Sequence, residues 1–248
     1  MPTISDFLAP RRLFTTADLD GWLLQTGQPS RDRRRWMLAT LHSTGDLTRV
    51  RRGLYVRTWT DDVMPDAHHL AAWFAKDAIL GLRTALEVRG VVAPPACDPQ
   101  CIYFTRLGTA GFGPDWHGVI MRPLVHPTAL VRAGKTTIET ELLDSDGCGP
   151  LRVTTTERAF VDILARSWVN STWQDIIATI DAIPALDLDR TVRYLEQLAN
   201  GTTAAKVGWV LEHRREHFAV PASVLDRIER SAPRSIRYVS RSCRQNGR

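Results

Sequence analysis

The first 58 residues switch from helix-spaced to strand-spaced apolar positions. A short apolar segment over residues 4–8 precedes a helix expected over residues 17–25, which Thr15 or Thr16 can cap. A turn over residues 27–30 leads to a second helix, which Ser30 can cap and which is expected to run to about Ser43. The pattern predicts that the inner face of this helix is formed by Trp36, Met37, Leu38 and Leu41.

Gly45 and Asp46 end this second helix, and a hairpin is expected to follow. Its strands cover residues 47–49 and 53–57, with Arg51 and Arg52 near the tip. Two helices joined by a turn and followed by a hairpin are typical of a winged helix-turn-helix, in which one helix enters the major groove of DNA. The sequence therefore predicts a DNA-binding domain over residues 1–58.

The rest of the chain predicts a mixed α/β domain over residues 66–230, joined by a linker over residues 59–65. Residues 66–88 have helical spacing with a break near Asp77, and a Pro-rich loop covers residues 90–99. Short strand-like segments follow at residues 101–107, 118–125, 136–143 and 151–155. A capping-box spacing between Thr154 and Glu157 opens a helix to Arg166, and further helices are expected over residues 173–183, 188–199 and 203–217. The expected fold class is α+β, with a small sheet, several helices and a mobile basic tail over residues 231–248.

Charge is divided unevenly along the chain. Residues 1–57 carry ten Arg, no Lys and five Asp, residues 58–229 have a net charge of −6, and residues 230–248 hold six Arg and no acidic residue. Four of the arginines crowd the first turns of the second helix, where the helix dipole disfavours cations and neighbouring arginines repel one another. Phosphates or guanine edges would relieve both penalties, because Arg binds either of them bidentately.

The helix and the hairpin together are therefore predicted to contact DNA. The predicted DNA-binding residues are Ser30, Arg31, Arg33, Arg34, Arg35, Arg49, Arg51 and Arg52. A solvated basic face neutralised by Asp32 and counter-ions is the alternative interpretation. The pattern does not separate arginines that read bases from arginines that only bind phosphates.

Motifs for catalysis, metal binding or nucleotide binding are weak. Residues 133–137, AGKTT, resemble the end of a phosphate-binding loop, but Ala129 stands where that loop needs Gly, and a strand-like segment follows. Cys97 and Cys101 form one close pair, whereas a structural zinc site needs four ligands. Residues 154–162 are the best candidate for catalysis, but a helix cap and an i, i+4 pair between Arg158 and Asp162 explain these residues as structural. We expect no catalytic residue, no metal, no cofactor and no enzymatic activity.

Composition narrows the class of protein further. The chain has 248 residues, of which 44% are hydrophobic and 24% charged, as is ordinary for a folded globular protein. No apolar run approaches the roughly 20 residues needed to span a bilayer, and the first residues lack the pattern of a signal peptide. Four cysteines are too few for a disulfide scaffold. We therefore expect a cytoplasmic protein that does not associate with membranes.

Four segments in order resemble motifs of one protein family. They are the hairpin segment Leu47–Val56, the segment Thr84–Glu87 followed by Gly90, the segment Thr155–Asp162, and the segment Val207–Glu212. In these segments the chain resembles the AbiEi family of bacterial antitoxins, which also occur as transcriptional regulators of toxin–antitoxin operons. The chain departs from the family at its end, where the Trp-containing strand is lacking, and in its Arg-rich N-terminal helices.

The resemblance implies a function for each domain. A winged helix would bind double-stranded DNA at an inverted repeat in the operon's own promoter and repress transcription, and the second domain would act as the antitoxin. The toxin would be nucleotidyltransferase-like and would be opposed without a stable complex, by a protein that is a monomer or weak dimer in solution.

The residues themselves leave two other functions open. One is a module that sequesters a toxin through the acidic middle region. The other is a metal-dependent nuclease that uses the acidic pairs Glu139 with Glu141 and Asp144 with Asp146.

Overall fold

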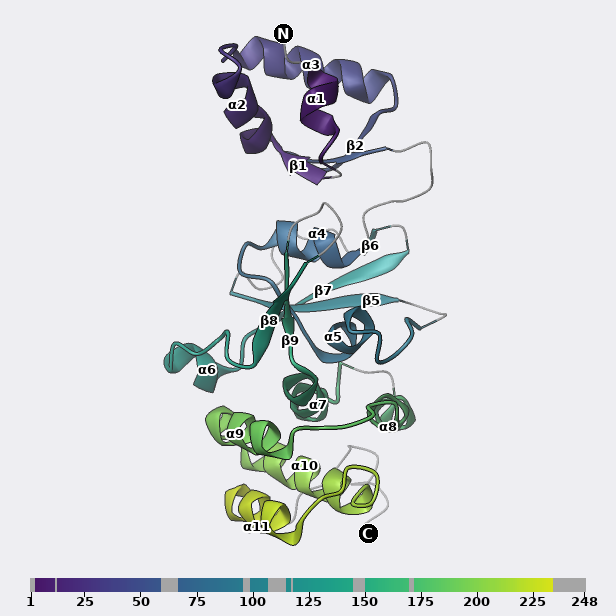
Figure 1. Ribbon diagram of the computed structural model, residues 1–248, viewed down its shortest axis with the longest axis vertical. Helices are drawn as coiled ribbons and strands as arrows, with labels where there is room; N and C mark the ends of the chain where they lie inside the picture. The colour runs from purple at the N-terminus through teal and green to yellow at the C-terminus, as the bar shows by residue number, and fades with distance from the viewer. Residues whose placement is uncertain are drawn as a thin grey trace. The chain divides into compact units, whose positions relative to one another are not determined.

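The computed structural model describes residues 3–11, 13–58, 67–95, 99–106, 115–116, 118–144, 150–169 and 172–233. The side chains of Arg51, Asp115 and Trp116 lie outside this description. The described residues form eleven helices and two sheets, so the chain is a mixed α/β protein, as the sequence predicts (Figure 1). The chain divides into two compact units, residues 1–70 with 144–150 and residues 71–143 with 151–248.

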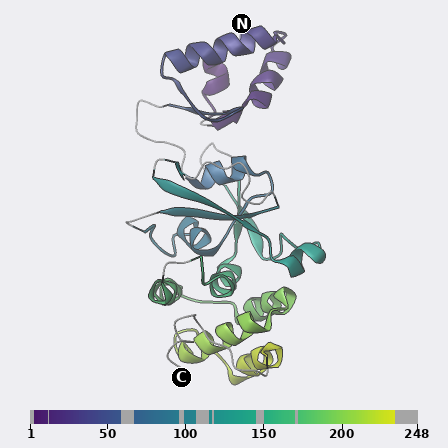
Figure 2. The ribbon, with the colours of Figure 1, turned by 180° about the vertical axis from the view of Figure 1, so that it is seen from behind.

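The first unit combines helices with a three-stranded sheet. Its elements are α1 (Ile4–Leu8), β1 (Leu13–Thr15), α2 (Thr16–Gln25), α3 (Arg31–Ser43), β2 (Leu47–Arg51) and β3 (Leu54–Arg57). β3 is the central strand and pairs antiparallel with β1 and with β2. Figures 1 and 2 both show α1, α2 and α3 on the same side of this sheet. The sequence pattern missed β1, because three residues are too few to display an alternating period.

Side chains fix where α2 and α3 begin. Asp18 Oδ2 accepts hydrogen bonds from the backbone N–H and the hydroxyl of Thr15, each at 2.7 Å, and Thr15 Oγ1 accepts the Asp18 N–H at 3.2 Å. Ser30 Oγ accepts the Arg33 N–H at 3.3 Å. The predicted caps are therefore confirmed, with Thr15 as the cap of α2. Such caps contribute about 1 kcal/mol each, because they satisfy backbone donors that lack an intrahelical partner.

One apolar cluster forms the core of the first unit. Its buried members are Phe7, Leu8, Phe14, Leu19, Leu23, Met37, Leu41 and Leu47. The assignment of Trp36 to this inner face is wrong, since its side chain is 65% exposed. Successive helical residues point about 100° apart, so Trp36 lies off the stripe that Met37 and Leu41 direct into the core.

A six-stranded mixed sheet organises the second unit. Its strands are β4 (Ile79–Leu80), β5 (Gln100–Thr105), β6 (Asp115–Trp116), β7 (Val119–Val125), β8 (Thr140–Leu143) and β9 (Leu151–Thr154). Their order is β6-β7-β5-β4-β9-β8; β5 with β7 and β4 with β9 are parallel, and the other neighbours are antiparallel. α4 (Ala67–Phe74) crosses the boundary between the two units at residue 70. The other helices of the second unit are α5 (Leu82–Val88), α6 (Thr128–Arg132), α7 (Thr156–Ala165), α8 (Trp173–Asp181), α9 (Leu188–Leu198), α10 (Gly201–His213) and α11 (Ala222–Ser231).

The helices of the second unit pack in successive layers. α5 contacts β5 and β9 of the sheet and packs against α7, which in turn contacts α9 and α10. α11 packs against both α9 and α10. Figure 2 shows this order from behind, with α9, α10 and α11 farther from the sheet than α7. The core of this unit therefore lies between the sheet and α7 and continues between the helices.

The structure corrects several predicted elements. Residues 66–88 are not two helices alone, because the two-residue strand β4 lies between α4 and α5. The strand expected over residues 136–143 begins only at Thr140, and the helix α6 precedes it. The helix expected over residues 203–217 covers Gly201–His213, and α11 was not predicted as an element. The expected linker and most of the basic tail lie outside the described residues.

Candidate nucleic-acid interface

Three arginines of α3 project into solvent. Arg31, Arg33 and Arg35 are all exposed, and no described residue forms a hydrogen bond or ion pair with their side chains. The three charges lie within the first two turns of one helix, where they repel one another and oppose the helix dipole. Asp32 is the acidic residue of this turn, and it offsets one of the three charges, so the helix presents a net positive site suited to an anionic partner.

Arg34 has a different environment from its neighbours. Its guanidinium forms an ion pair with Asp20 of α2, and only 24% of its side chain is exposed. The pair joins α2 to α3 and orients the helix that carries the exposed arginines. A surface pair of this kind contributes about 0–1 kcal/mol to stability.

The hairpin of β2 and β3 supplies further basic residues. Arg49 and Arg52 are exposed, whereas the side chain of Arg51 lies outside the described structure. Arg49 pairs across the hairpin with Tyr55, whose ring stacks on Phe14 with 5.7 Å between the ring centres. The core of the first unit therefore anchors the strand that faces Arg49.

One exposed residue of α3 was missed as a site candidate. Trp36 follows Arg35 directly and presents its indole to solvent. An indole combines a flat apolar surface with one N–H donor, so it can contact a thymine methyl group or a sugar. The sequence did contain a signal for this exposure, because Trp36 lies outside the buried stripe that Met37 and Leu41 define at helical spacing.

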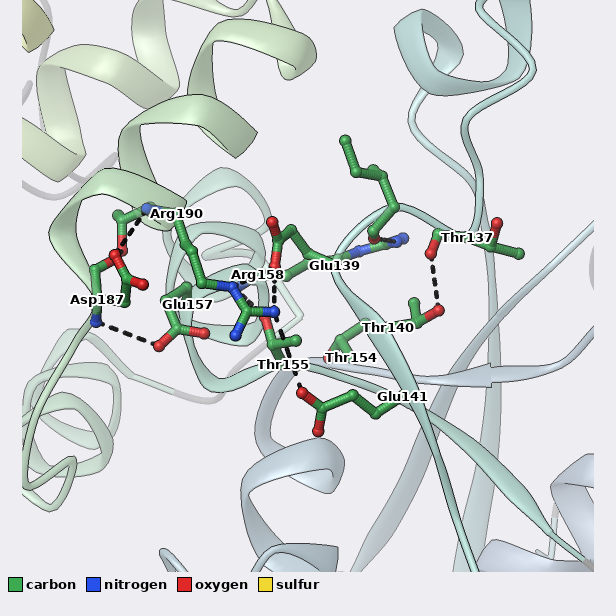
Figure 3. Close-up of polar contacts among 12 residues, drawn as sticks. Thr137, Glu139, Thr140, Glu141, Thr154, Thr155, Glu157, Arg158, Asp187 and Arg190 are labelled. Atoms are coloured by element: carbon green, nitrogen blue, oxygen red, sulfur yellow. Dashed lines mark hydrogen bonds and ion pairs between the residues drawn. The ribbon is translucent and has the colours of Figure 1, made fainter.

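The Thr155–Asp162 segment forms the start of α7 (Figure 3). Thr155 caps the helix, since its Oγ1 accepts the Arg158 N–H at 3.3 Å. The predicted capping box between Thr154 and Glu157 is therefore wrong by one residue. Glu157 instead accepts the backbone N–H of Asp187 at 3.2 Å, which ties α7 to the start of α9.

The predicted pair between Arg158 and Asp162 is confirmed. Both side chains are fully buried, with 3.3 Å between Arg158 Nε and Asp162 Oδ2. Arg158 Nη1 also donates to the carbonyls of Thr136 at 2.9 Å and Ile138 at 2.6 Å, and Tyr194 Oη donates to Asp162 at 2.8 Å. Burial raises the pKa of Asp162, and the charge of Arg158 opposes that shift. This network connects α7 to α9 and to the segment before β8.

Of the acidic residues considered for a nuclease, the two glutamates form ion pairs with arginines. Glu139 forms an ion pair with Arg190 at 2.6 Å (Figure 3). Glu141 forms an ion pair with Arg89 at 2.8 Å. Asp146 lies outside the described residues. Among the residues that are described, no three His, Cys, Asp or Glu side chains come together as metal ligands. The geometry therefore offers no specific support for the nuclease alternative.

The phosphate-loop-like segment and the cysteine pair do not form a binding site among the described residues. The AGKTT segment follows the helix α6 instead of preceding a helix, and Lys135 Nζ donates to Gln197 Oε1 at 2.7 Å. Cys101 is buried, and Cys97 lies outside the described residues.

A buried histidine makes the stability of the second unit depend on pH. His126 is 5% exposed and its ring stacks on Phe104. Burial, together with the charge of Arg158, lowers the pKa of His126 to about 4. The unfolded chain binds this proton near pH 6.5. Between pH 6.5 and 4 the unfolded state is therefore favoured increasingly as pH falls.

We expect the protonation of His126 to reduce the free energy of unfolding by about 3 kcal/mol as pH falls from 6.5 to 4. Above pH 6.5 the protein should keep its full stability with respect to this group. Urea unfolding across this range measures the effect. The His126→Phe variant retains a ring on Phe104 and serves as the reference, since His126 Nδ1 has no hydrogen-bond partner in the described structure. The raised pKa of Asp162 acts in the opposite direction and is common to both proteins. Parallel pH profiles for the two proteins would contradict the assignment.

Comparisons with known proteins add a structural likeness. No family model matches this chain, and no curated protein matches it. The crystal structure of the RV2827C protein from Mycobacterium tuberculosis is similar, with a TM-score of 0.54 and 17% sequence identity over 90% of this chain and 78% of that chain. This likeness concerns the fold. In the described part of the chain, no helix has both the length and the apolar content to cross a bilayer.

Proposed function

We propose that this protein is a DNA-binding transcriptional regulator whose first unit acts as a winged helix-turn-helix. The observation that carries the proposal is that Arg31, Arg33 and Arg35 of α3 are exposed and bond to no residue in the part of the chain that the structure describes. They lie on the second helix of a pair joined by a short turn, and the hairpin of β2 and β3 follows that helix, an order typical of this motif. α3 would be the recognition helix, and the hairpin would be the wing.

The environments of the basic residues suggest a role for each. Arg31, Arg33 and Arg35 lie at the N-terminal end of α3, the part of a recognition helix that contacts base edges, and Ser30 fixes that end. The arginines of the wing, 49, 51 and 52, would bind phosphates. Arg34 would orient α3 through Asp20 instead of reading DNA. This division assigns sequence specificity to α3 and general affinity to the wing.

The resemblance to the AbiEi antitoxins supports a more specific proposal. The target would be an inverted repeat in the protein's own promoter, and the second unit would oppose a nucleotidyltransferase-like toxin without forming a stable complex. Two copies on such a repeat would place their recognition helices about 34–36 Å apart, one turn of DNA. A monomer or weak dimer in solution would then pair on the operator.

The dependence of DNA affinity on salt tests whether both elements touch DNA. Contacts to about six phosphates give a slope near −5 in a plot of log K against log salt concentration. Arg49→Gln with Arg52→Gln should reduce that slope by about 2, because each lost phosphate contact releases about one counter-ion fewer. Fluorescence anisotropy with a labelled duplex between 50 and about 300 mM salt provides the measurement. A slope near −1 for the unmodified protein would mean that the wing and the helix do not both contact DNA.

A further inference from the structure

A cavity in the second unit is not used by the proposed function. Its volume is about 550 Å³, within the range of sites that hold small organic ligands. Its wall combines the end of α7, the residues before and within α6, and the junction between α9 and α10. The residues that give the cavity its chemical character are Asp162, Arg166, Trp168, Asn200, Gly201 and Thr202.

Arg166 gives one wall of the cavity a positive charge. One of its Nη atoms donates to the Val125 carbonyl at 2.6 Å, and its guanidinium lies 5.0 Å from the centre of the Phe104 ring. The remaining guanidinium N–H groups bond to no residue in the described structure. An arginine held in this way keeps donors available for a ligand with several acceptor oxygens.

A second, deeply buried arginine strengthens this positive charge. Arg158 is fully buried and pairs with Asp162, a residue of the cavity wall. Its Nη2 has no hydrogen-bond partner in the described structure, although a buried guanidinium nitrogen normally finds one. Arg158 and Arg166 carry two positive charges and Asp162 carries one negative charge. The net positive charge favours the binding of an anion.

Other parts of the cavity lining offer backbone donors and an aromatic surface. α10 begins at the cavity, where Asn200 Oδ1 accepts the Thr203 N–H at 3.2 Å. The N–H groups of Gly201 and Thr202 belong to the same first turn, whose donors have no intrahelical partner. The indole of Trp168 is 64% exposed and belongs to the same lining. A flat, exposed ring beside an anion-attracting wall is suited to a ligand that has both a phosphate and a base.

We propose that this cavity binds a nucleoside monophosphate, with the phosphate between Arg166 and the first turn of α10 and the base against Trp168. The proposal is independent of DNA binding by the first unit. It would make the second unit a receptor for a small ligand. Because stacking on an indole discriminates weakly among bases, the four common monophosphates should bind with affinities within about tenfold of one another.

Isothermal titration of the full-length protein tests the proposal with AMP, GMP, CMP, UMP, adenosine and inorganic phosphate as probes. AMP should bind at least tenfold more tightly than adenosine or phosphate, because only AMP has both a phosphate for Arg166 and a base for Trp168. Arg166→Gln should weaken AMP binding at least tenfold. Arg132→Gln replaces an exposed arginine of α6 that does not line the cavity and should leave it unchanged.

Trp168→Ala keeps the proposal falsifiable if Arg166→Gln fails to fold, since the Trp168 side chain is mostly exposed. This variant should weaken AMP binding at least fivefold and leave phosphate binding unchanged. Three results would overturn the proposal: no AMP binding at millimolar concentration, equal binding of AMP and phosphate, or AMP binding that survives loss of the indole. AMP bound by the basic residues of the first unit would be unaffected by either cavity variant and would count against the cavity.

Discussion

Replacing Arg31, Arg33 and Arg35 together by Gln is expected to weaken specific DNA binding by at least a hundredfold. Each arginine that contacts a base contributes about 1–3 kcal/mol to binding, so three losses exceed the roughly 2.7 kcal/mol that corresponds to a hundredfold. The same variant should retain its thermal unfolding temperature within about 2 °C, because exposed side chains without partners contribute little to stability. All three arginines are exposed on α3 and bond to no described side chain. Anisotropy titration and thermal unfolding measure the two quantities.

Two single variants show whether position on α3 matters. Arg132→Gln in the second unit removes another exposed arginine and should leave DNA binding unchanged. Arg34→Gln breaks the pair with Asp20, so it should lower stability by up to about 1 kcal/mol and reduce affinity less than Arg33→Gln does. If the triple variant bound DNA as the unmodified protein does, the assignment of α3 as the recognition helix would be wrong. If it unfolded instead, the arginines would be structural.

Arg158→Met is expected to destabilise the protein by about 3–5 kcal/mol at pH 7, the usual cost of leaving a buried partner charge uncompensated. The variant leaves the fully buried Asp162 without its charged partner, and it removes the donor to the carbonyls of Thr136 and Ile138. Replacing both members, Arg158→Met with Asp162→Leu, should restore part of this loss, because no isolated charge remains. Urea unfolding provides the free energies.

The matched control for the buried pair is an exposed one. Arg214 and Asp181 lie 2.6 Å apart with side chains that are 32% and 44% exposed. Arg214→Met should cost no more than about 1 kcal/mol, because water screens such a pair. A loss below about 1 kcal/mol for Arg158→Met as well would contradict the structural role of the buried network.

Local signals allowed the sequence to predict much of the first unit. The caps at Thr15 and Ser30 and the strands of the hairpin follow from residues within a few positions of one another. The shortest strands escaped prediction because they contain too few residues for a local pattern. β4 has two residues, too few for any period, although it lies in the middle of a six-stranded sheet.

The candidate sites depend on contacts that no local pattern contains. Arg34 meets Asp20 across 14 positions, and Arg190 meets Glu139 across 51. The sequence could therefore identify the arginine cluster of α3, but it could not tell that Arg34 is engaged whereas Arg31, Arg33 and Arg35 are available. The cavity beside Arg166 draws its wall from distant segments, and only the folded chain brings them together.

A mobility-shift titration against the DNA upstream of the protein's own gene tests the central claim most directly. The assay uses about 150 mM salt, where binding that rests on phosphate contacts alone is already weakened, and excess nonspecific competitor. The account predicts a discrete complex that survives the competitor and disappears in the variant that lacks Arg31, Arg33 and Arg35. A complex removed by the competitor, or one that the variant forms equally well, would contradict the claim that α3 reads an operator.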